Sequence, residues 1–326
     1  MLNEPIVVRV AGPADAAALL RLHHEGFASD WTPAQWRWRF LDNPLGRTEI
    51  SAAFTKDGRC VASFCGVPLP CRYGNELALA QRAGDVIVHP ALRAGMAGSQ
   101  LLLRTAEHFF GTFGGGDTRI VFGFPEPGLS RTIVRHCRFE AMADILLLTR
   151  PVDGKAASTA GAWSSHCGNA VPHDIDALAS AWPATAAGIV RDARYLRWRY
   201  EGNPHTAYVF VTVRDGGGRL RGVTVVRQSG LFPGSAMLME WLLADGDEQA
   251  SLHLLAAADA LAQTAGRTTL VASCSTTAPE FAWLQSVGCR VVPTLYQFVY
   301  RCWGPGLDRR ALRERWRHSL GDMDFT

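Results

Sequence analysis

The chain has 326 residues, a length that suits two domains better than one core. Hydrophobic residues make up 48% and charged residues 19% of the chain, and the net charge of +3 comes from well-mixed signs. This composition is typical of a globular protein and argues against a nucleic-acid-binding face. The eight cysteines show no Cys-x-x-Cys or zinc-like spacing, and no apolar run reaches the ~20 residues of a membrane span. The N-terminal residues do not resemble a secretory signal. We therefore expect a cytoplasmic protein with free thiols, no metal site and no membrane or nucleic-acid partner.

Strands and helices follow one another in a readable order over the first 150 residues. A strand is expected at Ile6–Val10, and helices are expected at Ala14–Phe27 and Pro33–Leu41. Three strands then lead to residue 88. The rest should be a helix at Ser99–Phe110, a strand at Arg119–Phe124, a helix at Gly128–His136 and a last strand. This order predicts an α+β fold with a mixed, mostly antiparallel twisted sheet flanked by helices.

A turn rich in small residues joins a β-branched strand to a helix at residues 85–103, D-V-I-V-H-P-A-L-R-A-G-M-A-G-S-Q-L-L-L. Pro90 cannot donate to a ladder, so the strand should end there. The helix that follows begins with N–H groups that have no partner inside it, and the helix dipole is positive at that end. Arg93 adds a formal charge, and Gly98 lets backbone come close to a ligand. The pattern favours a phosphate site; a plain strand-to-helix turn is the alternative.

The chain repeats itself. The segment W-R-W-R-F-L-D-N-P at 36–44 recurs as L-R-W-R-Y-E-G-N-P at 196–204, and similar hairpin, helix and strand patterns follow both copies. We predict a first domain at 1–150, a linker at 151–170 rich in Ala, Ser and Gly, a second domain at 171–303 and a basic tail at 304–326. The tail should form a surface helix between Asp308 and Leu320.

The two copies differ where a ligand would bind. In place of residues 89–98 the second copy has A-D-G-D-E-Q at 244–249. Its three carboxylates would repel a polyphosphate and are well placed to cap their own helix. We therefore expect one phosphate site per chain, in the first half.

At residues 85–103 the chain resembles the GNAT superfamily of acyl-CoA-dependent N-acyltransferases. The signature of that family is Arg or Gln, two residues, Gly, one residue, then Gly or Ala. Arg93 takes its first position and Gly98 its last, whereas Met96 stands at the middle glycine. Element order agrees over nearly all of residues 4–150, and the second copy resembles the family in element order only. The resemblance implies two tandem GNAT-like domains, of which the first holds acetyl-CoA or another acyl-CoA. The residues it places on the coenzyme are Val86, Ile87, Val88, Arg93, Ala94, Gly95, Met96, Ala97, Gly98 and Ser99.

The resemblance also implies the reaction. The thioester carbonyl would lie against backbone N–H groups at 86–88, and an amine would attack it directly. Asp85 is the best-placed carboxylate for a catalytic role, although it could instead cap a turn after Gly84. The Tyr that many members use as general acid falls at Val134 here. Trp31 and Phe124 occupy regions that border the acceptor in the family. The Trp-Arg segment at 36–39 recurs in the second half and is therefore interpreted mainly as a packing element.

Three functions follow from these patterns. The first is an N-acyltransferase, most simply an N-acetyltransferase, that acts on a primary amine of a small molecule as a monomer or homodimer. The second is a non-catalytic acyl-CoA-binding or sensing module. The third is a structural tandem without a coenzyme site.

Overall fold

The chain divides into two compact units in the computed structural model, which describes residues 5–152, 163–183, 185–229, 232–244, 246–304 and 308–323. Unit 1 takes Met1–Cys71, Ala78–Ala143 and Tyr296–Leu307. Unit 2 takes Arg72–Leu77, Asp144–Leu295 and Asp308–Thr326. Each unit is therefore assembled from separate stretches of the sequence.

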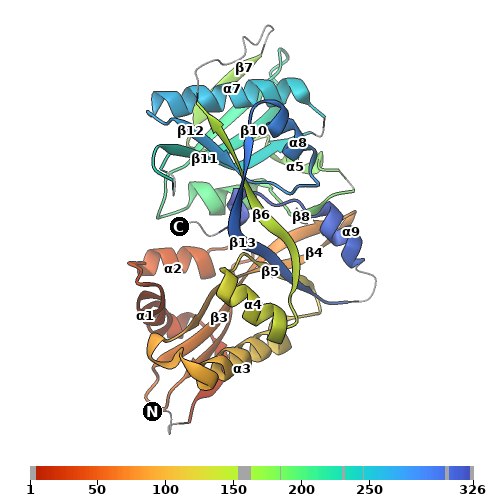
Figure 1. Ribbon diagram of the computed structural model, residues 1–326. Helices are drawn as coiled ribbons and strands as arrows, with labels where there is room; N and C mark the ends of the chain where they lie inside the picture. The colour runs from red at the N-terminus through yellow and green to blue at the C-terminus, as the bar shows by residue number, and fades with distance from the viewer. Residues whose placement is uncertain are drawn as a thin grey trace. The chain divides into compact units, whose positions relative to one another are not determined.

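Unit 1 is a sheet with helices packed on it. Its elements are β1 (Val7–Ala11), α1 (Ala16–Phe27), α2 (Pro33–Phe40), β2 (Glu49–Phe54), β3 (Cys60–Tyr73), β4 (Glu76–Val88), α3 (Gly95–Phe113), β5 (Thr118–Gly123), α4 (Pro127–His136) and the start of β6 (Glu140–Pro151) (Figure 1). The strand order is β1-β2-β3-β4-β5-β13, where β13 comprises Arg290–Cys302. β4 and β5 run parallel, whereas β1 and β2, β2 and β3, and β5 and β13 pair antiparallel.

Helix α3 shows why unit 1 packs as it does. Its apolar residues recur at helical spacing, so that Leu102, Ala106 and Phe109 share one face and are buried. That face contacts β1 and β2. Phe109 also belongs to a cluster that includes Phe64 of β3 and Ile133 of α4. Figure 1 shows α3 and α4 lying side by side. This packing fixes the direction from which α3 approaches the end of β4.

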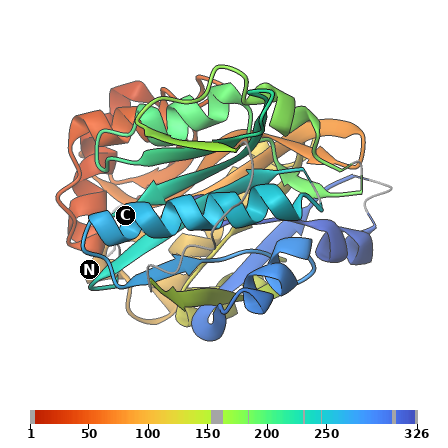
Figure 2. The same cartoon turned by 90° about the horizontal axis from the view of Figure 1, so that it is seen from above.

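Unit 2 repeats this plan. Its elements are β7 (Ser164–Gly168), α5 (Asp176–Ser180), β8 (Ala187–Ile189), α6 (Ala193–Leu196) with a π-helical turn (Arg197–Glu201), β9 (Val209–Arg214), β10 (Leu220–Arg227), β11 (Ser235–Leu243), α7 (Glu248–Thr264), β12 (Thr269–Ala272), α8 (Pro279–Ser286), the start of β13 (Arg290–Cys302) and α9 (Arg309–Arg315). The strand order is β6-β12-β11-β10-β9-β7, with β11 and β12 parallel. Helix α7 runs across the strands of this unit (Figure 2).

Each unit takes its last strand from the other half of the sequence. β5 of unit 1 pairs with residues 299–302 of β13, and β12 of unit 2 pairs with residues 148–151 of β6. Apart from this exchange, β7, β9, β10, β11 and β12 occupy the positions of β1 to β5 in the same order. The expected α+β fold class with two similar units is thereby confirmed. The domain limits 1–150 and 171–303 stay a prediction, because the compact units take parts of β6 and of β13 from both sides of them.

Two expected segments differ from the structure. Within the expected linker 151–170, residues 153–162 lie outside the described residues and Ser164–Gly168 form β7, which pairs with β9. The expected surface helix at Asp308–Leu320 ends at Arg315, as α9. Trp316 and Leu320 are buried in unit 2, because the apolar side chains of the tail supply part of its core.

Candidate functional site

Strand β4 leaves its parallel partner before it ends. The β4–β5 ladder runs from Leu79 to Arg82, where Arg82 is opposite Phe122, and stops there. Three residues later Asp85 adopts a left-handed backbone conformation with φ of 47°, and Ser63 Oγ donates to its carbonyl at 2.9 Å. A non-glycine residue at positive φ is strained, and it bends the strand. Residues 86–88, the expected contacts of the thioester, therefore follow a bend and have no ladder partner in β5.

The Asp85 carboxylate lies in a buried group of charges. Its side chain is 10% exposed, Arg39 Nη1 lies 3.6 Å and His23 Nε2 lies 3.7 Å from Oδ1. Burial opposes the charged form, but Arg39, His23 and Arg82 outweigh it and hold the pKa of Asp85 below its ordinary value. A carboxylate held ionised in this way is a weak base. Its geometry suits positioning of the β4 bend better than removal of a proton.

His23 and Arg39 are site residues that the sequence reasoning missed. The Trp-Arg segment was interpreted mainly as a packing element, and its Arg39 is 3% exposed beside Asp85. Arg37, two residues earlier in the same helix, is 67% exposed. The repeat offered a signal, because Arg199 at the equivalent position of unit 2 is also buried. Arg199 donates to the carbonyls of Gly321 and Met323, so the repeat indicates that this arginine is buried but does not identify its partner.

The Arg93 side chain is exposed, and its guanidinium binds two backbone carbonyls. Its Nε donates to the carbonyl of Val88 at 3.3 Å and its Nη2 to the carbonyl of Gly26 at 3.1 Å. These bonds tie the β4–α3 turn (residues 89–98) to the end of β4 and to α1. Arg93 therefore helps to hold the turn that precedes α3.

The two glycines of the turn have separate roles. Gly95 has φ of 75°, which a side chain disfavours, and it begins α3. A Cβ at Gly98 would meet the carbonyl oxygens of Leu92 and Arg93 at 2.4 and 2.6 Å. Gly98 therefore lets the helix lie directly against the turn. Met96 is 77% exposed, so its side chain leaves the backbone around it accessible.

The start of α3 has no side-chain cap. Ala94 is its N-cap residue, no side chain accepts from the first N–H groups, and no acidic residue lies in the first turn. Ala94, Ala97 and Ser99 are exposed. In unit 2 the opposite holds. The carboxylate of Asp247 accepts from Ala250 N at 3.0 Å at the start of α7 and binds Arg221 Nε at 3.0 Å. Asp245 lies outside the described residues. The contrast between the two helix ends agrees with a single anion site, in unit 1.

The remaining sequence-predicted residues fall into two groups. Trp31 is buried and lies against His23, with ring centroids 4.6 Å apart, and Arg39 lies over it, so it belongs to the Asp85 group. Phe124 instead packs against Phe298, with centroids 4.9 Å apart. His89 accepts from Ala91 N at 3.2 Å and pairs with Glu25 at 2.9 Å, which makes it a cap of the turn.

Other kinds of site find no support among the residues that the structure describes. No group of three or more His, Cys, Asp or Glu side chains there could hold a metal ion. No described helix is both long and apolar enough to cross a bilayer.

Comparison with known proteins places the fold. No protein-family model matches the sequence, and no curated protein matches it. Among solved structures, it is similar to a GCN5-related N-acetyltransferase from Anabaena variabilis, with a TM-score of 0.67 and 11% identity over 91% of this chain and 73% of that one. It is also similar to a tandem GNAT protein from the clavulanic acid biosynthesis pathway, with a TM-score of 0.57 and 15% identity over 93% and 99% of the two chains.

A third similar structure is the N-myristoyltransferase of Saccharomyces cerevisiae with bound myristoyl-CoA and inhibitors. Its TM-score is 0.56 and its identity 12%, over 92% of this chain and 80% of that one. The chain therefore has the fold of the GNAT superfamily, with two GNAT-like units as in a tandem GNAT protein.

Proposed function

We propose that the protein is an N-acyltransferase that moves an acyl group, acetyl in the simplest case, from acyl-CoA to a primary amine of a small molecule. The observation that carries the proposal is the exposed, uncapped start of α3 directly after a strand that has left its partner. A diphosphate at the helix N-terminus would satisfy the N–H groups, and the acyl chain would follow residues 86–88.

The chemistry asked of the protein is modest. Direct attack needs the amine and the thioester held together and the carbonyl polarised, and backbone N–H groups after the β4 bend are suited to that task. Asp85 then acts as a positioning residue, because its ion pair with Arg39 supports the bend. Water would carry the proton away from the amine.

A second candidate is a module that binds acyl-CoA without turnover. Two observations favour it: Asp85 is held ionised by its neighbours, and Val134, 36% exposed, stands where many family members carry a Tyr acid. Coenzyme binding without thiol release for any acceptor would support this alternative.

The test combines calorimetry with acetyl-CoA and a thiol-release assay over a panel of amino sugars, polyamines and amino acids. Arg93→Glu should weaken acetyl-CoA binding about tenfold or more, or ~1.4 kcal/mol, because it reverses the charge beside α3 and frees the turn. Arg104→Glu on the exposed side of the same helix makes the same change of net charge and should leave binding intact. Equal retention of acetyl-CoA by both variants would refute the site.

A further inference from the structure

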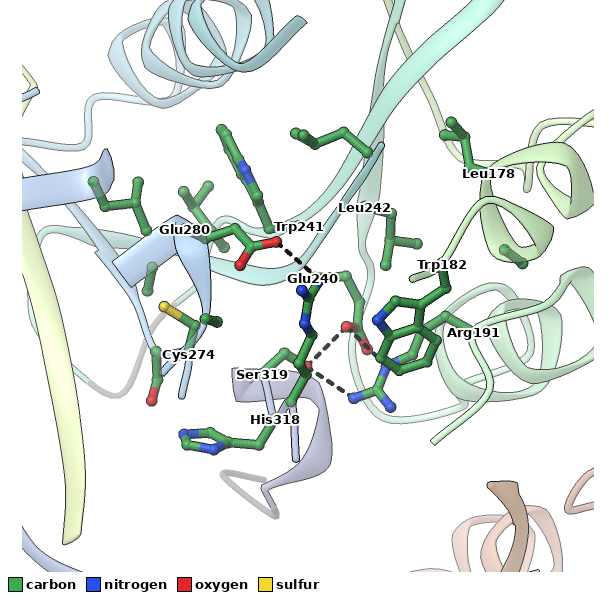
Figure 3. Close-up of a pocket in the computed structure, with 18 residues that line it drawn as sticks. Leu178, Trp182, Arg191, Glu240, Trp241, Leu242, Cys274, Glu280, His318 and Ser319 are labelled. Carbon is green, nitrogen blue, oxygen red and sulfur yellow. Dashed lines mark hydrogen bonds and ion pairs between the residues drawn. The ribbon is translucent and has the colours of Figure 1, made fainter. Parts of the chain in front are cut away.

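Unit 2 contains a half-enclosed cavity of about 90 Å³ that lies outside the proposed coenzyme site (Figure 3). It opens where the β11–β12 ladder ends, after Met237 pairs with Val271. Its apolar lining comes from the segment at α5, from β11 and from α8, and includes Leu178, Trp182, Leu238, Leu242 and Leu284. In Figure 3, Leu178 and Trp182 lie on one side of the space, and Cys274 and Glu280 lie on the other.

The C-terminal tail builds one wall of this cavity. Ser319 forms an antiparallel bridge with Cys274, and Arg317 N donates to the carbonyl of Ala187 at 2.7 Å. Arg317, His318 and Ser319 all line the cavity. Backbone contacts therefore attach this wall both to Ala187 and to Cys274.

Two polar side chains that line the cavity, Glu240 and Arg191, are hydrogen-bonded to other groups of the protein. Glu240 accepts from Tyr200 Oη at 2.6 Å, from Ser319 Oγ at 2.8 Å and from Arg191 Nε at 3.3 Å. Arg191 Nη2 also donates to Asp322 at 2.6 Å. Glu240 therefore offers a ligand no unshared charge, although it occupies the position in β11 that Asp85 occupies in β4.

The charges around the cavity balance. Arg191 and Arg317 face Glu240 and Glu280, and Arg317 Nη1 lies 3.7 Å from Glu280 Oε1. Burial lowers the pKa of His318 to about 4, so this imidazole is neutral at pH 7. Asp322 and Arg199, buried behind the lining, add one charge of each sign. A ligand with a net charge would lose its hydration here without gaining a counter-charge.

We propose that this cavity binds a small, uncharged, mainly apolar molecule, with about three or four nonhydrogen atoms inside it, since a cavity of about 150 Å³ holds the six carbons of benzene. A nucleotide is charged and therefore lies outside this class. The start of α7, the helix that follows β11, is moreover already capped by Asp247. The proposed function in unit 1 does not depend on this site.

The experiment compares three probes with the same three-carbon tail: butyramide, butylamine and butyrate. Methyl NMR of the leucines reports binding to the full chain. Butyramide should shift the signals of Leu178 and Leu242 and bind about tenfold or more tightly than either charged probe, or ~1.4 kcal/mol. Failure of butyramide to bind, or tighter binding of a charged probe, would overturn the proposal.

Two variants of α5 test whether the probe binds in this cavity. Ala179 of α5 lines the cavity, so Ala179→Leu should fill it and weaken butyramide binding about tenfold or more. Ala177→Leu changes an exposed residue of the same helix that does not line the cavity and should leave binding unchanged. If Ala179→Leu fails to fold, Ala278→Val fills the opposite side, where φ of −79° and ψ of 141° suit a β-branched residue. Unchanged butyramide binding in a folded cavity-filling variant would show that the probe binds elsewhere and refute the assignment.

Discussion

Replacement of Ala94 by Asp should make the protein more stable and its coenzyme binding weaker. Ala94 is the exposed N-cap of α3, with φ of −76° and ψ of 141°, the extended backbone of a capping residue. An Asp there would accept from the first N–H groups of α3, as Asp247 does at α7. A new cap contributes about 1 kcal/mol, and its charge adds about 0.3–1 kcal/mol through the helix dipole.

The same carboxylate would oppose a diphosphate. Two unit charges 4–6 Å apart repel by about 3–4 kcal/mol at an effective dielectric of about 20, and solvent at this exposed turn reduces that figure. We expect about 2 kcal/mol, which weakens acetyl-CoA binding about 30-fold. Urea unfolding measures the gain in stability, and calorimetry at low salt measures the loss of affinity.

Two controls separate charge from capping. Ala94→Asn adds a cap without a charge, so it should raise stability but weaken acetyl-CoA binding less than Ala94→Asp does. Added salt should narrow the difference in acetyl-CoA affinity between the two variants. S-acetylpantetheine lacks the diphosphate and should bind both variants and the wild type alike. A stabilised Ala94→Asp protein that retains full affinity for acetyl-CoA would refute the diphosphate site at α3.

Three further predictions concern single residues. Gly98→Ala should lower both stability and acetyl-CoA affinity, because its Cβ collides with two carbonyl oxygens of the turn. Gly111→Ala, in open space on the same helix, should stabilise the protein by up to about 1 kcal/mol. Thermal melts and calorimetry compare the two variants, and equal melting temperatures would contradict the close approach at Gly98. Asp247→Ala should destabilise unit 2 by about 1–2 kcal/mol through loss of the α7 cap, without creating a second acetyl-CoA site; a calorimetric stoichiometry of two would contradict this. His318, buried against Ser275 with Asp322 and Arg191 nearby, has its pKa lowered to about 4, so the unfolded chain binds a proton more readily. Stability should therefore fall as pH decreases from about 6.5 to 4, by roughly 3 kcal/mol in total, and His318→Gln should flatten this part of the profile in urea titrations.

Local patterns in the sequence determine much of the fold. The β4–α3 turn was predictable because a proline, small residues and an apolar helix follow one another within fifteen residues. The repeat of the Trp-Arg segment likewise predicted two units of the same element order. In both cases the information lies in neighbours along the chain.

Other features depend on distant partners. The strand patterns of β6 and β13 do not identify their partners, so the sequence does not show that each unit takes its last strand from the other half of the chain. The carboxylate beside the buried Arg39 comes from Asp85, forty-six residues away. Arg-rich composition suggested a solvated tail, whereas Trp316 and Leu320 complete the core of unit 2. The cavity of unit 2 depends on that same tail, and no local motif indicates it.

The exchanged strands also affect synthesis of the protein. When a ribosome has made unit 1 up to β5, the edge of β5 still awaits residues 299–302 near the end of the chain. At about 5–20 residues per second, the wait lasts roughly 10–30 s. During that time the open edge could pair with another nascent chain. Separate expression of either half would make this exposure permanent, and aggregation of such a fragment is the expected result.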